Sequence, residues 1–482
     1  MMNKTFGVCL GLLAFGLVGL GAPPSHAKGR LAADESVSGS ETAASSTTSS
    51  TSAATASSPA DLQQRIDALK AELADLNTQL AAEKAEAPAA SADPTPQGQG
   101  APAPAAAPAA APAAAAPMPL PSPSMSAPLA TGIPHELPAG PFGKIEITGV
   151  LSGIGLFGNN PVAKGDEGHV DLSNGQVFIQ KTSGVVQFYL QGGAYNIPAL
   201  GTPFVKTSDT VKDLYGPFPV GYLKLVKGNF NVEVGALPTL IGAEYTFTFE
   251  NMNIERGLLW NQEQAVSRGI QINDTYKKLT VAFSWNDGFY SDRFTSLSGS
   301  LAYAINAANT LTFVASGNAG SYARVGPASG ATPLLQNNSQ IFDLIYTYSH
   351  GNWMIMPYYQ YTAVPSLPNL VIPIPVGGHT NGGAILANYN FKHGFSLAVR
   401  PEYIKSSGSL ATNEANLLGY GPGTGAFSFT VTPTWAKDAF FLRGDISVVH
   451  LTNLVSGDVG FGLIPGTKTN QARAVIETGF LF

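Results

Sequence analysis

Charged residues in the second half of the chain have the types and spacing that could do chemistry together. They comprise four residues of one long loop and six residues of three alternating segments: Glu244, Glu250, Glu255, Arg256, Arg400, Glu402, Arg443, Asp445, Arg473 and Glu477. In each segment an arginine and a carboxylate lie an even number of positions apart, so on a strand both side chains share a face. Arginines facing carboxylates across a polar space produce a transverse electric field, and we predict that this field orients polar solutes.

Sequence motifs of catalysis and cofactor binding are absent. The chain contains no Gly-x-Ser-x-Gly, no His-Glu-x-x-His and no Gly-x-x-x-x-Gly-Lys-Ser/Thr, so we predict that it is not an enzyme and binds no cofactor. In one loop, Asp166, Glu167, His169 and Asp171 could bind a divalent cation. Such clusters are more often simply solvated, and we predict no metal site. The net charge of −6 argues against a nucleic-acid partner.

The elements that would position these residues are alternating apolar–polar segments with the period of a β-strand. They lie near residues 144–156, 175–182, 184–195, 218–227, 229–236, 267–275, 277–286, 297–305, 309–317, 338–349, 352–362, 380–391, 394–405, 425–436, 438–449 and 472–482. Tight turns alternate with long connections rich in Gly, Pro, Ser and Asn. This arrangement predicts an all-β fold, a transmembrane antiparallel β-barrel of about 16 strands over residues 139–482.

The alternation also predicts which face of each strand meets lipid. Near residue 430, Ser428 and Thr430 share one face, whereas Phe427 and Phe429 share the other. Only 12% of residues are charged, against roughly 25% in ordinary soluble proteins. An apolar outer face and a polar inner face are typical of a barrel with a water-filled lumen.

The last strand ends on an aromatic residue at the apolar face. Phe482, Phe480 and Ile476 alternate with Glu477 and Arg473. This ending resembles the last strand of bacterial outer-membrane barrels, where the terminal Phe is read by the barrel assembly machinery. We therefore predict that Phe482 and Phe480 form the assembly signal.

The third long connection, from about Leu237 to Val266, is the longest loop between the predicted strands. It mixes acidic residues with Phe, Leu and Trp260. Because apolar side chains gain little in an exposed loop, we predict that this loop folds into the barrel, packs on its wall and narrows the lumen. The alternative is a loop that caps the barrel from outside, with the arginines only neutralising neighbouring carboxylates.

The N-terminus has the organisation of a secretory signal peptide, which we assign to residues 1–27. Lys4 precedes an apolar run, and small residues stand before and at Ala27. The only cysteine, Cys9, lies in this segment, so the mature chain would have no thiol for a disulfide or a metal site.

Three segments are expected between the signal peptide and the barrel. Residues 28–57 are a Ser/Thr/Ala-rich linker, and residues 87–138 are a semi-rigid Pro/Ala-rich spacer. Between them, residues 58–86 predict a short coiled-coil helix. Its apolar positions alternate spacings of four and three, a heptad seam formed by Leu62, Ile66, Leu69, Leu73, Leu76 and Leu80. The seam implies self-association, although a lone helix that docks on another protein is an alternative.

One part of the barrel region resembles a known family. The stretch Gly-Ala-Leu-Pro-Thr-Leu-Ile-Gly-Ala-Glu-Tyr from Gly235 to Tyr245, and the following Arg256-Gly257-Leu258-Leu259, resemble the putative β-barrel porin-2 (OmpL-like) proteins. Ser267-Arg268-Gly269-Ile270 and Trp285-Asn286-Asp287-Gly288 extend the resemblance, although the last element departs from the Asn-Gly-Trp-Asp order of the family. The resemblance covers the barrel region, excludes the seam helix, and implies a passive outer-membrane channel.

The sequence thus predicts an outer-membrane porin of a Gram-negative-type bacterium, through which small hydrophilic solutes diffuse. Expected partners are outer-membrane lipid, the assembly machinery, two further copies in a homotrimer, and the cell wall through a periplasmic N-terminal extension. One alternative is a substrate-selective channel for sugars or organic acids. Another is a structural barrel with a closed lumen that tethers the outer membrane to the cell wall.

Overall fold

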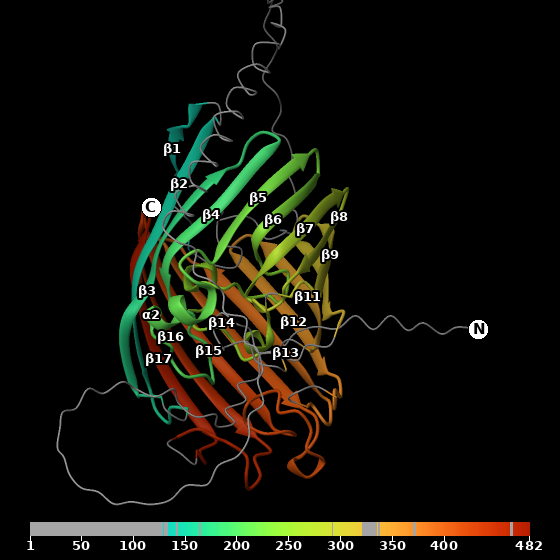
Figure 1. Cartoon of the computed structure of the whole chain (residues 1–482). Coiled ribbons are helices and arrows are strands. Elements are labelled where there is room, and N and C mark those ends of the chain that lie inside the picture. Colours follow the sequence, from blue (N-terminus) through green and yellow to red (C-terminus); the bar gives the residue numbers. More distant parts are fainter. Residues whose placement is uncertain are drawn as a thin grey trace, which may run out of the picture. The chain divides into compact units, whose positions relative to one another are not determined.

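The computed structural model describes residues 129, 134–140, 143–162, 165–291, 293–320, 335, 338–369, 373–462 and 466–482. In this part of the chain, strands β2 to β17 form one closed antiparallel sheet (Figure 1). Each strand pairs with the next along the chain, and β17 pairs with β2 to close the ring. A barrel of sixteen strands is therefore confirmed.

The strands of the ring are as follows: β2 (Lys144–Gly158), β3 (Gly168–Lys181), β4 (Val186–Tyr195), β5 (Val220–Lys227), β6 (Phe230–Pro238), β7 (Val266–Tyr276), β8 (Leu279–Asn286), β9 (Ser296–Asn306), β10 (Asn309–Asn318), β11 (Gln340–His350), β12 (Trp353–Val364), β13 (Gly378–Asn390), β14 (Phe395–Ser406), β15 (Gly425–Lys437), β16 (Phe440–Thr452) and β17 (Asn470–Leu481). A further strand, β1 (His135–Pro138), pairs only with the start of β2.

Helical structure in the described residues is confined to loops. It consists of the helix α2 (Thr207–Thr210), the π-helical turn η2 (Val211–Tyr215), and the 3₁₀ turns η3 (Thr248–Glu250), η4 (Trp260–Gln262) and η5 (Leu410–Thr412). None of the described helices is long and apolar enough to cross a bilayer.

All sixteen predicted segments form strands, and all but one begin within two residues of the predicted start. The second segment was expected to start at residue 175, whereas β3 starts at Gly168. The pairing of β2 with β3 shifts register at Ser152 and leaves Ser173 as an extra residue. Ser173 and Asn174 are consequently both buried, and two successive inward residues interrupt the period of two. Because this β-bulge interrupts the alternation, the sequence pattern did not reveal the first half of β3.

The two faces of the barrel follow the predicted alternation. On β17, Ile476 and Phe480 are 52% and 50% exposed, whereas Val475 and Glu477 are 4% and 0% exposed. Outward aromatic rings contact each other near the short turns, as between Phe440 and Phe480, whose centroids lie 5.3 Å apart. Aromatic residues at this level are typical of the membrane interface of outer-membrane barrels.

The N-terminal predictions fall almost wholly outside the described residues. The signal peptide, the linker and the heptad helix cannot be compared with the structure. The last residues assigned to the spacer, His135–Pro138, form β1, whose partner strand β2 begins at Lys144. An ion pair at 2.5 Å between Glu136 and Lys144 joins the exposed β1 to the exposed first residue of β2.

Candidate functional site

The loop between β6 and β7, residues 239–265, lies inside the barrel, and we call it the inward loop. Four of its five charged residues are buried and Glu250 is half-buried, and most of its apolar residues are buried as well. Met252 and Leu258 pack in a cluster with inward residues of β10 to β16. Phe247 and Phe249 pack in a second cluster with inward residues of β2 to β5. The inward loop therefore contacts walls on both sides of the lumen.

Side chains within the inward loop hold its own backbone in place. Asn251 accepts a hydrogen bond from the Tyr245 amide at 2.7 Å and donates to the carbonyl oxygens of Tyr245 and Phe247. Glu250 accepts from the Phe247 amide at 2.9 Å. These bonds replace the ladder that a strand would provide, because a buried backbone group without a partner is costly.

Arg400 on β14 connects the wall to the inward loop by two ion pairs. Its guanidinium lies 2.5 Å from Glu244 of the loop and 3.1 Å from Glu402 of its own strand. It also donates to the carbonyl oxygen of Glu255 at 2.8 Å. All these groups are buried, so the charges of Glu244 and Arg400 are neutralised at short range.

Arg443 on β16 binds the backbone of the inward loop. It donates to the carbonyl oxygens of Thr248, Asn251 and Met252 at 2.9, 2.7 and 2.9 Å. Its charge is balanced by Glu477, the directly opposite residue of β17, at 3.6 Å. Arg443 thus binds three carbonyl groups within residues 248–252, a segment that no strand supports.

Arg473 on β17 joins the inward loop to the second long loop. It pairs with Glu255 at 2.8 Å and donates to the carbonyl oxygens of Ala199 and Thr202. The two loops also bond directly, since the Arg256 amide donates to the Pro198 carbonyl oxygen at 2.9 Å. The two loops are therefore held together at one charged wall.

The wall carboxylates accept hydrogen bonds from loop amides. Asp445 accepts from the amides of Ile254 and Glu255 at 2.9 and 2.8 Å. Glu402 accepts from the Leu258 amide at 3.2 Å. Arginines bind the loop's carbonyl groups and carboxylates bind its amides. This wall therefore provides partners for both the hydrogen-bond donors and the acceptors of the loop backbone.

The ten charged residues selected from the sequence make different kinds of contact. Glu244 and Glu255 contact the wall arginines, as the alternation and the loop prediction together suggest. Glu250 bonds within the loop, and burial raises its pKa to about 7. Arg256 donates to the Ile254 carbonyl oxygen at 2.8 Å. The transverse field on solutes stays a prediction, because the loop covers Arg400 and its neighbours.

The wall next to the arginines, formed by β11 to β13, also holds the inward loop, and the sequence analysis did not select it. Gln262 accepts hydrogen bonds from Thr362 on β12 and Thr380 on β13 at 3.1 and 2.8 Å. Asp343 on β11 accepts from the Gly242 amide at 3.0 Å. Asp343 shares a face of a predicted strand with Ile341 and Ile345, so the period of two could have placed it inside with them.

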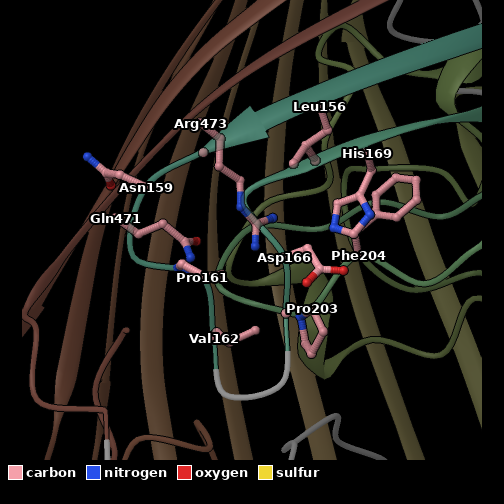
Figure 2. A pocket seen from close by; sticks show the side chains of 12 residues that line it. Leu156, Asn159, Pro161, Val162, Asp166, His169, Pro203, Phe204, Gln471 and Arg473 are labelled. Atoms are coloured by element: carbon pink, nitrogen blue, oxygen red, sulfur yellow. The ribbon is translucent and has the colours of Figure 1, made fainter. Parts of the chain in front are cut away.

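The acidic cluster of the first long loop is not assembled into a metal site. Asp171 accepts from the amides of Leu172 and Thr207, and His169 stacks on Phe204 with centroids 4.6 Å apart. Figure 2 shows His169 beside Phe204, with Asp166 lying below Arg473. The cavity between them measures about 10 Å³, the space of one water molecule. Among the described residues no group of three His, Cys, Asp or Glu could hold a metal ion.

Phe482 extends the pairing of β17 with β2. The Phe482 amide donates to the Gly149 carbonyl oxygen at 2.9 Å, and the Gly149 amide donates back at 2.6 Å. A Cβ atom at position 149 would lie 2.5 Å from the Phe482 ring, so only glycine leaves room for it. Phe480 and Phe482 face outward and are exposed. Their reading by assembly machinery stays a prediction.

Comparisons with known proteins concern mainly the barrel. The family model described as "Putative beta-barrel porin-2, OmpL-like" matches residues 144–482. Outer-membrane expressed OmpT of Vibrio cholerae is similar in structure, with a TM-score of 0.48, 10% identity, and 72% of this chain and 100% of that chain covered. The anion-selective porin from Comamonas acidovorans has a TM-score of 0.43 and 11% identity, with 70% of this chain and 99% of that chain covered. Salmonella typhi OmpF in complex with daunomycin has a TM-score of 0.45 and 12% identity, with 72% of this chain and 100% of that chain covered. No curated protein matches the chain.

The contacts of Arg443 predict how the inward loop is released. Arg443→Met removes the donor of three loop carbonyl groups and leaves Glu477 without its cation, at a cost of about 3–5 kcal/mol. We expect the loop to detach, so that chymotrypsin cuts the purified full-length protein after Phe247 or Phe249 far faster than it cuts the wild type.

Lys405→Met, which removes an exposed cation from β14, is the matched control and should leave cleavage unchanged. Equal cleavage of wild type and Arg443→Met would show that this arginine does not hold the loop.

Proposed function

The chain belongs to the putative beta-barrel porin-2, OmpL-like family, and we propose that its barrel is a water-filled channel for passive diffusion of small hydrophilic solutes across the outer membrane. The proposal is supported by the division of the barrel into an apolar outer face and an inner face rich in Ser, Thr, Asn and Gln. Such an inner face gives polar solutes hydrogen-bonding partners along the path. We further propose that the protein is not an enzyme.

The mechanism that we propose for this channel rests on the inward loop, which is bonded to the barrel wall inside the lumen. We propose that this loop sets the narrowest cross-section of the channel. Its contacts with Arg400, Arg443 and Arg473 support this role, because a loop fixed at three wall positions cannot move aside freely. Since each arginine is paired with a carboxylate, neither sign of charge predominates and ion selectivity should be weak.

Shortening the inward loop tests this mechanism. Deletion of residues 244–256 removes the segment that contacts the arginine wall, and we expect the single-channel conductance in planar bilayers to rise several-fold. Replacing the exposed residues 410–413 of another long loop by Gly and Ser at equal length is the control, and conductance should not change.

A folded deletion variant with wild-type conductance would refute the constriction. A purified wild-type protein that never conducts would instead favour the structural barrel with a closed lumen.

We propose that the outer-membrane barrel assembly machinery reads the C-terminal residues Phe480 and Phe482. The proposal is supported by their outward position on the strand that closes the barrel. Deleting Phe482 removes both the ring and its bonds to Gly149, and we expect loss of most folded protein from the outer membrane.

The control for this deletion is Phe395→Ala, which removes an outward aromatic ring, 54% exposed, elsewhere on the barrel. We expect it to assemble normally. A Phe482-deleted chain at normal levels in outer-membrane fractions would contradict the assembly proposal.

We propose that residues 28–138 form a periplasmic extension after removal of the signal peptide 1–27. The Ser/Thr/Ala-rich linker, the helix 58–86 and the Pro/Ala-rich spacer would reach the cell wall from there. The heptad seam supports self-association, and we propose a homotrimer embedded in outer-membrane lipid. All the seam residues lie outside the described part of the chain.

Charges in the seam should separate the helices. In a peptide of residues 58–86, Leu69→Asp with Leu76→Asp opposes the apolar burial that alone stabilises the seam. We expect the wild-type peptide to oligomerise at high concentration in analytical ultracentrifugation, and the variant to stay monomeric. Ala74→Asp, at an outer heptad position, should still oligomerise. A monomeric wild-type peptide would disprove the seam.

A further inference from the structure

Two buried carboxyl groups meet where the inward loop contacts β11. Asp343 accepts a hydrogen bond from the Gly242 amide at 3.0 Å. The carboxyl group of Glu263 covers the other side of the same glycine, since a Cβ atom at position 242 would lie 1.8 Å from Glu263 Oε2. Glu263 is 0% and Asp343 1% exposed. Both acids therefore contact one residue in a site closed to bulk water.

Neither acid has a cationic partner among the described residues, unlike the acids of the arginine wall. Glu244 and Glu255 lie 2.5 and 2.8 Å from an arginine. Glu263 accepts only from the Tyr358 hydroxyl, at 3.4 Å. Within the described chain, Glu263 Oε2 and Asp343 Oδ1 receive no hydrogen bond. Each of these two orphan oxygens requires a hydrogen-bond donor.

The surrounding groups make two negative charges here unfavourable. Tyr358 on β12 faces Glu263 directly, and Glu244 of the loop and Glu402 on β14 add negative charge from further away. Arg400, which pairs with Glu244 of the same loop, is already engaged by Glu244 and Glu402. Burial, followed by the charge of Asp343, raises the pKa of Glu263 well above its usual range. An unpaired buried ion costs several kcal/mol, so the pair is not doubly ionised.

We propose that Glu263 and Asp343 share one proton and form a latch that holds the inward loop against β11. The shared proton lies between Glu263 Oε2 and Asp343 Oδ1, supplies the donor that both oxygens lack, and lowers the charge of the pair from two negative charges to one. Loss of this proton leaves two neighbouring anions and frees the loop from β11, while the contacts of the loop with β12, β13 and the arginine wall remain. The latch thus positions the loop, and its conductance readout rests on the proposed channel function.

The direction of the pH dependence follows from the raised pKa of Glu263. A carboxyl group with a raised pKa in the folded state stabilises that state at acidic and neutral pH, and the stabilisation is lost as the pH rises through the raised value. The inward loop should therefore be docked on β11 at low pH and released from β11 at alkaline pH, while its bonds to β12, β13 and the arginine wall persist. A loop released from β11 widens the lumen.

The experiment compares single-channel conductance of the purified full-length protein between roughly pH 6 and roughly pH 9. We expect the wild-type conductance to rise at least twofold toward alkaline pH. Glu263→Gln keeps a donor for Asp343 but cannot titrate, so its conductance should stay at the low-pH value throughout. Glu167→Gln, which changes an exposed loop carboxylate, is the matched control and should behave as the wild type.

A wild-type conductance independent of pH, or a rise that persists in Glu263→Gln, would overturn the latch. If the pair held a cation, calcium added at fixed pH would change the conductance of the wild type but not that of Glu263→Gln. That result would also overturn the shared proton.

A second readout does not depend on conduction. Infrared difference spectra of the protein at neutral pH should contain a protonated-carboxyl band that is absent in Glu263→Gln, and its absence from the wild type would refute the proposal. A channel silent at every pH would contradict the proposed function, and the infrared band then decides the latch by itself.

Discussion

The bilayer offers no water to the backbone, and the rest of the structure depends on this constraint. It requires every strand to pair on both sides, so β17 must return to β2. The closed sheet encloses a lumen, and a loop that enters the lumen must find partners for its own amide and carbonyl groups on the wall. Arg443 and Asp445, adjacent on the inward face of β16, supply partners of opposite polarity.

The inward loop is held by two walls of different chemistry. On β14, β16 and β17 it meets arginines with nearby carboxylates, and on β11 to β13 it meets amide, hydroxyl and carboxyl groups. Buried ion pairs contribute little net stability, because the cost of removing charges from water offsets most of their attraction. Here these ion pairs contribute to geometry, since the pair with Arg400 fixes the position of Glu244. The wall formed by β11 to β13 is the side on which we propose that the loop responds to pH.

Much of the fold follows from local patterns in the sequence. Each strand of the ring was predictable, because a period of two is visible without knowledge of the partner strand. The faces were predictable for the same reason, as Glu477 and Ile476 illustrate. The exception is β3, where the bulge at Ser173 breaks the period. The apolar residues of the loop between β6 and β7 likewise indicated a buried loop before its path was known.

The sequence by itself determined the strands, their inner and outer faces, and the charged residues that point inward. Only the tertiary structure decided which of these charges meet. Glu244 and Arg400 are 156 positions apart, and Glu263 reaches Asp343 from a loop whose path no periodicity describes. Alternation specifies the side of the sheet on which a residue lies, whereas contacts across the lumen depend on how the closed sheet curves and where the loop crosses it. These are properties of the whole barrel, so no local segment of the sequence encodes them.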